Sequence, residues 1–366
     1  MIIDVVAGTR PNLVKVAPLV RNLDCLNATI RFIYTGQHFD YSMSGSFFED
    51  LNLRQPEFNL ACSLGSNAVV ISSVLKNYDE LLAQQKSDLC MVVGDVNSTL
   101  GSALAAKCRG IDLAHVEAGL RSGDRSMPEE INRIMVDSVR DLLFVTSVSA
   151  RENLLSEGRL GNQIYFVGNV MIDTLMMTTK RHRAPAWLPK SLDYESQNYL
   201  VLTLHRAYIS ADTNLLTAVI ETVCKTASSE KVIFPCHPKN KAALANLESL
   251  LPNLVVVEPM RYLEFQYLIA NATLVIGDSG GVSEETTFYG VPCITVRDTT
   301  ERPETITCGT NVLSGYDLEN LKRLISRLLN EKRDTAQDVI VPEKWDGKAA
   351  YRVSECISQI YGLGFE

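Results

Sequence analysis

The sequence predicts an α/β protein built from two doubly wound parallel sheets. Short apolar runs alternate with helical segments of roughly 10–15 residues along most of the chain, which is typical of βαβ units. The pattern weakens once, over residues 181–198, where prolines and charged residues interrupt it. The chain has 366 residues, which is more than one ordinary core accommodates, so we expect two domains.

The N-terminal domain is predicted to span residues 1–180. Its expected strands are Ile2–Ala7, Ile30–Thr35, Leu89–Val93, Ile111–Val116, Leu142–Val145 and Ile164–Val167. Apolar spacing predicts helices that begin near Pro11 and at Pro128, and helices over 66–85 and 99–109. This regular alternation predicts a parallel sheet whose strand ends meet at one edge.

A second alternating series follows the linker at 181–198 and defines a C-terminal domain over 199–345. Its expected strands are Tyr199–Leu204, Lys231–Pro235, Leu254–Val257, Leu274–Ile276 and Pro292–Val296, and a helix is expected over 317–330. A last helical segment, assigned to 346–366, has no strand after it. We expect this terminal helix to be able to pack back on the N-terminal domain.

Composition excludes several classes of protein. The net charge is −8, which argues against a nucleic-acid or polybasic membrane surface. No apolar run approaches the roughly 20 residues of a membrane span, and the start of the chain resembles a strand more than a signal peptide. The nine scattered cysteines contain no C-x-x-C pair, which indicates reduced thiols and no zinc site. We therefore expect a cytoplasmic protein.

The stretch His115–Arg133 brings acids and bases to the end of a predicted strand. Ligands bind at such strand ends in open α/β sheets. A buried acid needs a partner, so Glu117 is expected to pair with Arg121, Arg125 or a substrate. Glu129 and Glu130 open the next helix, where the helix dipole favours acids, and for Glu130 we favour this helix-opening role.

Two further groups follow strands of the N-terminal domain. Arg10 and Lys15 flank a turn and a helix start, where free N–H groups hold anions; two solvated cations on a tight turn are the alternative. Asp95 directly follows an apolar strand. It either caps the next helix, a role that Asn97 or Ser98 could fill instead, or it is a catalytic acid.

The C-terminal domain carries a predicted phosphate-binding set. His205 and Arg206 end its first strand and suit a diphosphate, whereas His237 is equally consistent with a structural role. The segment 277–285 follows a strand and opens a helix, so its N–H groups would face a phosphate. The charged segment 297–304 either lines the site or caps a helix. The candidate residues of segment 277–285 are Ser279, Gly280 and Gly281 for the phosphate and Glu285 for ribose hydroxyls.

These groups together predict a nucleotide-diphosphate site with acid/base residues. No cluster of metal ligands and no dinucleotide fingerprint is present in the sequence, so neither a metal nor NAD is expected.

The motifs resemble those of the non-hydrolysing UDP-N-acetylglucosamine 2-epimerases. They run in order from residue 8 to residue 304 and read GTRPNLVKVAPL, TGQH, GDVNSTL, HVEAGLRSGDRSMPEEINR, GNVMIDTL, TLHR, DSGGVSEE and RDTTERPE. The resemblance implies the GT-B fold, in which two Rossmann-like domains flank the active-site cleft. It also implies a homodimer, a UDP-sugar substrate and no cofactor.

The resemblance also implies roles for the candidate residues and a reaction. The C2 proton of UDP-GlcNAc is removed while UDP leaves C1, and UDP then adds back to the 2-acetamidoglucal to give UDP-ManNAc, a surface polysaccharide precursor. The acid/base set would be Asp95, Glu117 and Glu129, with His205 as a further catalytic residue. The diphosphate would be held by Arg10, Lys15, His205, Ser279, Gly280 and Gly281, and the ribose by Glu285.

Other functions fit the same motifs. The chain could act on a modified UDP-HexNAc, because Ala207-Tyr208-Ile209 departs from the family pattern after Arg206. A hydrolysing 2-epimerase would release ManNAc and UDP. A GT-B glycosyltransferase would need an acceptor and would not exchange the C2 proton. A non-catalytic sugar-nucleotide-binding paralogue is disfavoured because Asp95, Glu117 and Glu129 are all present.

The segment after the second strand also predicts how the enzyme is regulated. Some bacterial members of the family bind UDP-GlcNAc as an activator through a Gln-His-x-x-Gln/Met pattern, but Gln37-His38 is followed here by Phe39-Asp40. We therefore expect no strong activation by UDP-GlcNAc. Initial rates with UDP-ManNAc alone should be linear, and a lag that trace UDP-GlcNAc abolishes would contradict this prediction.

Overall fold

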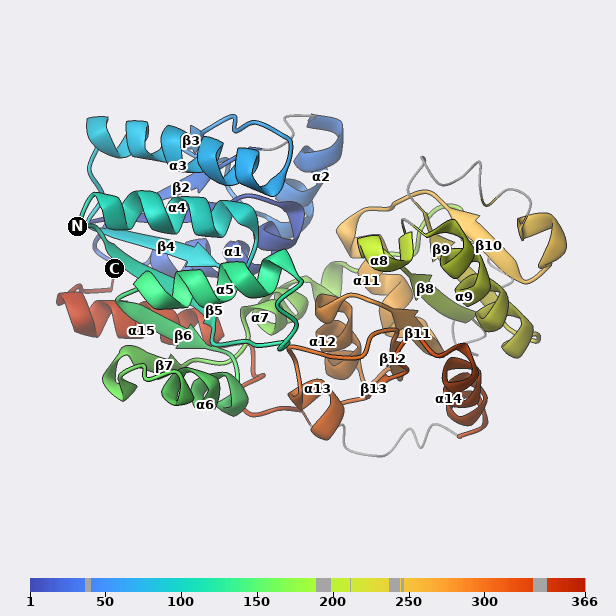
Figure 1. Cartoon of the computed structure of the whole chain (residues 1–366). Helices are drawn as coiled ribbons and strands as arrows, with labels where there is room; N and C mark the ends of the chain where they lie inside the picture. Colours follow the sequence, from blue (N-terminus) through green and yellow to red (C-terminus); the bar gives the residue numbers. More distant parts are fainter. Residues whose placement is uncertain are drawn as a thin grey trace. The chain divides into compact units, whose positions relative to one another are not determined.

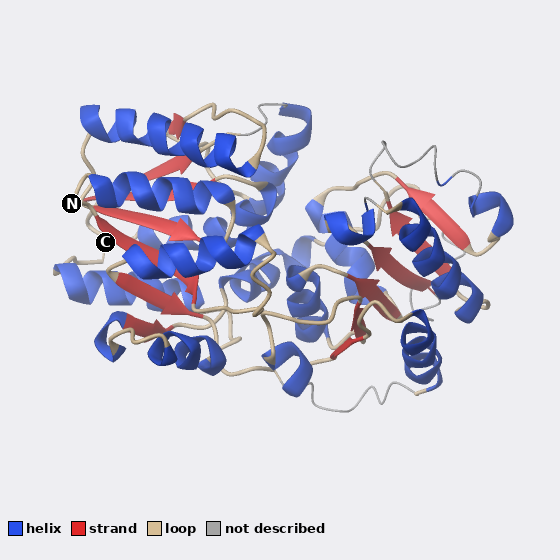
Figure 2. Cartoon of the chain, in the orientation of Figure 1, coloured by secondary structure: helices blue, strands red, loops and turns tan. Residues whose placement is uncertain are grey.

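The structure is a computed structural model, and the residues that it describes fall into two compact units. It describes residues 1–36, 41–188, 199–210, 212–236, 244, 247–331 and 341–365. One unit comprises Met1–Thr178 and Glu343–Glu366, and the other comprises Thr179–Pro342. Each contains one parallel sheet with covering helices (Figures 1 and 2). The predicted α/β class with two doubly wound sheets is confirmed.

The N-terminal unit contains a seven-stranded parallel sheet with the order β3-β2-β1-β4-β5-β6-β7. Its strands are β1 (Ile2–Ala7), β2 (Thr29–Tyr34), β3 (Phe58–Asn59), β4 (Leu89–Val93), β5 (Asp112–Ala118), β6 (Leu142–Val145) and β7 (Ile164–Phe166). Only the short edge strand β3 was not predicted. Because β4 lies between β1 and β5, the turns that follow these three strands are neighbours.

Helices cover both faces of this sheet. They are α1 (Arg10–Leu23), α2 (Tyr41–Leu51), α3 (Asn67–Gln84), α4 (Asn97–Cys108), α5 (Pro128–Val139), α6 (Val148–Ser156), α7 (Val170–Thr178) and α15 (Ala349–Tyr361). Helices α3, α4 and α5 pack side by side on one face, and α1, α7 and α15 pack together on the other (Figure 1). Alternate strand residues such as Cys90 and Val92 join Leu100 and Ala103 of α4 in one core cluster.

Helix α15 comes from the end of the chain but belongs to the N-terminal unit. The carboxylate of Asp173 on α7 accepts hydrogen bonds from the backbone N–H groups of Ala349 (3.1 Å) and Ala350 (2.7 Å). At the other end of α15, the Tyr361 hydroxyl donates to Asp112 over 2.8 Å. Asp173 therefore provides a tertiary N-terminal cap for α15.

The C-terminal unit contains a six-stranded parallel sheet with the order β10-β9-β8-β11-β12-β13. Its strands are β8 (Tyr199–Thr203), β9 (Lys231–Pro235), β10 (Leu254–Val257), β11 (Leu274–Gly277), β12 (Cys293–Thr295) and β13 (Asn311–Leu313). The helices whose bounds the structure describes in this unit are α8 (Ala207–Ser210), α9 (Thr213–Thr226), α11 (Tyr262–Asn271), α12 (Gly280–Tyr289), α13 (Glu304–Thr307) and α14 (Leu318–Asn330). Leu200 and Leu202 of β8 face the α9 and α14 side, and Val201 faces the α11 and α12 side.

None of the nine cysteines, all of which the structure describes, forms a disulfide, as the sequence predicts. Burial raises the pKa of the Cys224 thiol to about 12 and that of the Cys293 thiol to about 11, so both stay protonated at neutral pH. In the part of the chain that the structure describes, no helix is long and apolar enough to cross a membrane.

Candidate functional site

Glu117 has a strained backbone conformation within β5. The sequence predicts that this strand ends at Val116, but the structure continues it to Ala118 through an irregularity in the pairing with β6. Glu117 has a φ of 71°, which is rare for a residue with a side chain. Such strain costs about 1–3 kcal/mol and persists where the surroundings impose it, often at active sites.

The partner of Glu117 is Lys15. The Lys15 ammonium donates to the Glu117 carboxylate, and the two side chains are 13% and 3% exposed. The expectation that Arg121 or Arg125 would be this partner is wrong. Arg121 instead pairs with Asp137 (2.8 Å) and Glu157 (2.7 Å). The sheet order explains the difference, because it places the turn after β1, which leads into α1, close to the end of β5.

Gly94 gives these groups the room to meet. Its φ is 68°, and a Cβ atom on it would lie 3.2 Å from Glu117 Oε2 and 3.4 Å from Lys15 Nζ. The neighbouring Asn12 side chain donates to the carbonyl oxygen of Val93 over 2.9 Å. A glycine at this strand end thus lets a carboxylate and an ammonium group approach the backbone closely.

Asp95, the next residue, is held by α5. Its Oδ2 accepts from Arg133 Nη1 over 2.5 Å, and its backbone carbonyl accepts from the Asn132 side chain over 2.9 Å. The N-cap position of α4 is Val96, without a side-chain hydrogen bond. Of the two roles considered for Asp95, capping of α4 is therefore wrong.

Glu130 holds the loop that follows β5. Its carboxylate accepts from the backbone N–H groups of Ser122 and Gly123, both over 3.0 Å, and pairs with Arg133 over 2.7 Å. Burial opposes ionisation of Glu130, but these donors still lower its pKa below the usual value. Glu130 lies in the first turn of α5, as predicted, and its buried carboxylate in addition clamps the loop that follows β5.

Glu129 lies in the same first turn of α5 and is half-buried. Among the described residues, its carboxylate has no hydrogen-bond partner.

Arg10, at the start of α1, places its guanidinium 5.9 Å from the centre of the Phe47 ring, which is a cation–π distance.

The fully buried pair of His115 and Asp137 supports the ends of β4 and β5. His115 Nδ1 lies 2.7 Å from Asp137 Oδ1, and His115 Nε2 lies 2.8 Å from the carbonyl oxygen of Gly94. Asp137 also accepts from the backbone N–H of Gly119 over 3.1 Å. Burial raises the pKa of Asp137, but the charges of His115 and Arg121 outweigh burial and lower it. This pair fixes the glycine turns on both sides of Glu117.

The C-terminal unit arranges its own set of groups around Asp278, which is fully buried after β11. Its carboxylate accepts from the backbone N–H groups of His205 (3.0 Å) and Arg206 (2.9 Å). The exposed His205 ring forms a 2.8 Å hydrogen bond with Thr203, and Arg206 Nε donates to the Asp278 carbonyl. Asp278, which the sequence analysis did not single out, thus holds the predicted His-Arg pair beside Ser279.

Buried ion pairs lie behind the start of α12. Arg297 pairs with Glu301 over 2.9 Å, and Arg302 pairs with Glu284. A Cβ atom on Gly280 would lie 2.5 Å from Glu301 Oε1, so a side chain there would require the Glu301 carboxylate to move. The charged segment that follows β12 therefore packs closely against the predicted phosphate loop.

Glu285 is buried one turn into α12. Its carboxylate accepts from the Gln266 side chain over 2.7 Å. Burial, with Glu284 nearby, raises its pKa to about 8 against the opposing effect of Gln266. A group that donates hydrogen bonds to this carboxylate would favour its ionised form.

The residues that hold these groups in place were not predicted from the sequence, above all Arg133, Asn132 and Asp278. The Glu130–Arg133 spacing of three residues on one helix was an available signal for an ion pair. His237 and the Gln37–Asp40 segment lie outside the described residues.

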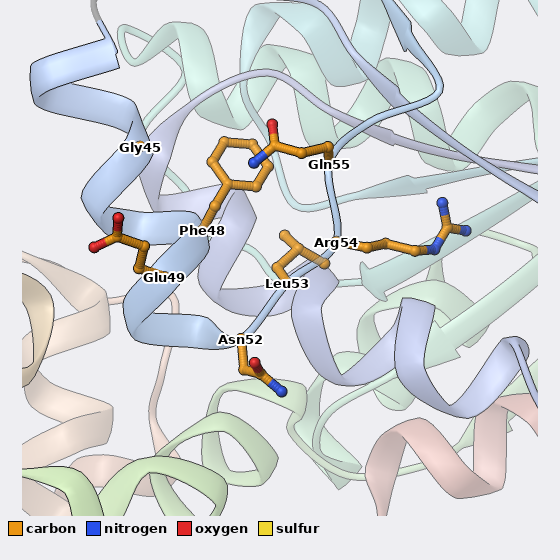
Figure 3. A pocket seen from close by; sticks show the side chains of 7 residues that line it. All are labelled: Gly45, Phe48, Glu49, Asn52, Leu53, Arg54 and Gln55. Carbon is orange, nitrogen blue, oxygen red and sulfur yellow. The ribbon is translucent and has the colours of Figure 1, made fainter.

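The N-terminal unit also has a hollow of about 360 Å³ that is distinct from the predicted site residues. The hollow is lined by residues of α2 and of the segment that follows this helix, namely Gly45, Phe48, Glu49, Asn52 and Leu53–Gln55 (Figure 3). Arg54 is engaged there with Asp24 and Glu57. None of the predicted site residues lines this hollow.

The two doubly wound sheets, each with charged groups gathered at its strand ends, define a two-domain α/β protein of the GT-B class. A family model described as UDP-N-acetylglucosamine 2-epimerase matches residues 23–358. The chain therefore belongs to the UDP-N-acetylglucosamine 2-epimerase family and is an epimerase.

Individual relatives agree with this assignment. The UDP-N-acetylglucosamine 2-epimerase of Methanocaldococcus jannaschii is 38% identical over 345 residues, which cover 91% of this chain and 94% of the relative. A crystal structure of the Methanocaldococcus jannaschii UDP-GlcNAc 2-epimerase in complex with UDP-GlcNAc and UDP has a TM-score of 0.87 and 37% identity, covering 98% of this chain and 100% of that one. The UDP-2,3-diacetamido-2,3-dideoxy-D-glucuronate 2-epimerase of Pseudomonas aeruginosa is 37% identical, covering 85% of this chain and 87% of the relative.

Proposed function

We propose that this protein is a non-hydrolysing epimerase that interconverts UDP-GlcNAc and UDP-ManNAc. The observation that carries the proposal is the strained, buried Glu117 with Lys15 directly on its carboxylate. Gly94 lies beside the Glu117 carboxylate and directly precedes Asp95. Glu117 and Asp95 together therefore supply acid/base groups at one place. UDP leaves C1 as the C2 proton is removed, and the 2-acetamidoglucal is held until UDP returns.

The proposed roles follow the chemistry of each group. A proton must leave one face of C2 and arrive on the other, so at least two routes are needed, and we assign them to Asp95, Glu117 and Glu129. The C2 proton is weakly acidic, so stabilising the departing UDP matters as much as the base. Arg10, Lys15, His205 and Arg206 supply positive or donor groups for the diphosphate. Ser279, Gly280 and Gly281 present the N-terminus of α12 to it.

Proton NMR of the reaction in D2O tests this function. We expect deuterium at C2 of both nucleotide-linked sugars as UDP-GlcNAc and UDP-ManNAc equilibrate. Release of free ManNAc with UDP would instead establish hydrolysis. Turnover only with an added acceptor, without C2 exchange, would establish a glycosyltransferase.

The raised pKa of Glu285, about 8, predicts that UDP affinity depends on pH. We propose that Glu285 accepts hydrogen bonds from both ribose hydroxyls, which favours its ionised form. Binding should then release a proton from Glu285 below about pH 8, so UDP affinity should rise with pH up to about 8 and level off above it. Calorimetry in buffers of different ionisation enthalpy would measure the released proton.

Glu285→Gln is the matched control for this pH dependence, because the amide cannot ionise. The variant should bind UDP more weakly and should lose the part of the pH dependence that lies near pH 8. The same pH dependence in wild type and variant would show that another group is responsible.

A modified UDP-HexNAc is the second candidate substrate. The 37% identical Pseudomonas aeruginosa relative, named as an epimerase of a diacetamido glucuronate, shows that this level of identity spans different sugars. The Ala207-Tyr208-Ile209 segment follows Arg206, and Tyr208 is an exposed residue whose ring contacts the tilted ring of Tyr316, with ring centres 4.2 Å apart. C2 exchange measured across a panel of UDP-HexNAc compounds would show which sugar reacts fastest.

We further propose a homodimer that feeds surface polysaccharide synthesis, as the family resemblance implies, and a cytoplasmic location, as the composition indicates. Light scattering of the purified protein would measure the mass of the assembly against the 40.5 kDa chain.

A further inference from the structure

We propose that Arg133 is a positioning residue that holds Asp95 in its reactive orientation. The proposal rests on the proposed function, in which Asp95 belongs to the acid/base set. Arg133 Nη1 lies 2.5 Å from Asp95 Oδ2, while Nε and Nη2 of the same guanidinium lie 3.2 Å and 2.7 Å from Glu130 Oε2. One planar cation thus joins a predicted catalytic carboxylate to a structural one.

The burial of the two partners gives this contact a direction. The side chain of Arg133 is 1% exposed, and that of Asp95 is 26% exposed. The guanidinium therefore contacts the carboxylate from the protein side, and part of Asp95 remains accessible to a substrate. Because a guanidinium is planar and always charged, it directs its N–H groups at a carboxylate oxygen in a fixed geometry that a lysine does not reproduce.

The same turn of α5 also holds the backbone of Asp95. Asn132 donates to the Asp95 carbonyl over 2.9 Å and to the Asn97 side chain over 3.1 Å. Neighbouring residues of one helix thus fix both the main chain and the side chain of Asp95. This arrangement removes the freedom that a carboxylate on a turn would otherwise have.

Glu130 explains how a buried arginine is held in place for this task. A buried charge without a partner is strongly destabilising, and Glu130, only 2% exposed, supplies the counter-charge. Glu130 is in turn anchored by the N–H groups of Ser122 and Gly123. If Arg133 served only this loop clamp, losing Glu130 or Arg133 should have the same effect on the reaction.

Steady-state C2 exchange with full-length variants separates these roles. Arg133→Met should lower kcat about 10²-fold, the scale of one acid/base group, while KM and the calorimetric affinity for UDP change little. Arg133→Lys should recover part of this loss. Glu130→Gln, which breaks the other ion pair of the same arginine, should lower kcat much less. In the Asp95→Asn background, Arg133→Met should have almost no further effect, because the two residues act as a unit.

Two results would overturn the proposal. One is an equal loss of kcat in Arg133→Met and Glu130→Gln that parallels their loss of thermal stability, and the other is an undiminished Arg133 effect in the Asp95→Asn background. If Arg133→Met does not fold, Arg133→Lys with and without Asp95→Asn provides the same comparison. Failure of the proposed function would look different, because wild type would not exchange C2 or Asp95→Asn would keep full kcat.

Discussion

Glu117→Gln is expected to lower the rate of C2 proton exchange by about 10²–10⁴-fold while UDP still binds. The amide keeps the shape of the side chain and can still accept a hydrogen bond from Lys15. It cannot take up a proton from carbon. The loss should therefore appear in kcat, which NMR measures as deuterium incorporation, and calorimetry with UDP should show an affinity close to wild type.

Glu157→Gln provides the matched control for this prediction. Glu157 is also a carboxylate of the N-terminal unit in an ion pair, but its partner is Arg121 and its side chain is 31% exposed. Its exchange rate should stay close to wild type. If Glu117→Gln retained wild-type exchange, the proposed role of Glu117 would be wrong, whatever its backbone strain.

Asp4→Ala is expected to produce the largest loss of stability, roughly 3–5 kcal/mol of unfolding free energy, because it leaves Arg31 as a buried unpaired charge. Asp4 is fully buried on β1 and accepts from Arg31 Nε (2.6 Å) and Nη2 (2.8 Å). The Tyr78 hydroxyl also donates to it over 2.7 Å. One substitution therefore removes the shared acceptor of two buried side chains.

The measurement should report on the N-terminal unit alone, because two units need not unfold together. Trp345 is buried in that unit and Trp187 lies in the other, so tryptophan fluorescence in a Trp187→Phe background during urea unfolding isolates it. Asp24→Ala is the control, since its partner Arg54 forms a partly exposed pair that contributes at most about 1 kcal/mol. Equal losses in the two variants would contradict the assignment.

The fold could be predicted from the sequence because its signals are local. Apolar runs and helical spacing located β1, β4, β6 and the start of α5 at Pro128, all of which match the structure. The two-residue β3 and the three-residue β13 are too short to show a period, and β5 was cut short at Val116. A charged residue at φ 71° inside a strand contradicts the pattern on which strand prediction depends.

The candidate site was less predictable, because its partners depend on strand order. The motif GTRPNLVK marked Lys15, but only the β1-β4-β5 order brings Lys15 to Glu117 across Gly94. Arg121 is nearer in sequence to Glu117, yet it turns toward Asp137 on α5. The role of Asp278 could not be predicted from the sequence for the same reason, since its partners, His205 and Arg206, lie about seventy residues earlier in the chain.

Positional isotope exchange tests the central proposal, elimination and return of UDP, most directly. UDP-GlcNAc would carry labelled oxygen at the bridge between C1 and the β-phosphorus, and phosphorus NMR would follow the label. If UDP leaves and returns, the label should scramble into the non-bridging β-phosphate positions while C2 epimerises. Epimerisation with the label retained in the bridge would show that the C1–oxygen bond never breaks, and the proposed mechanism would be wrong.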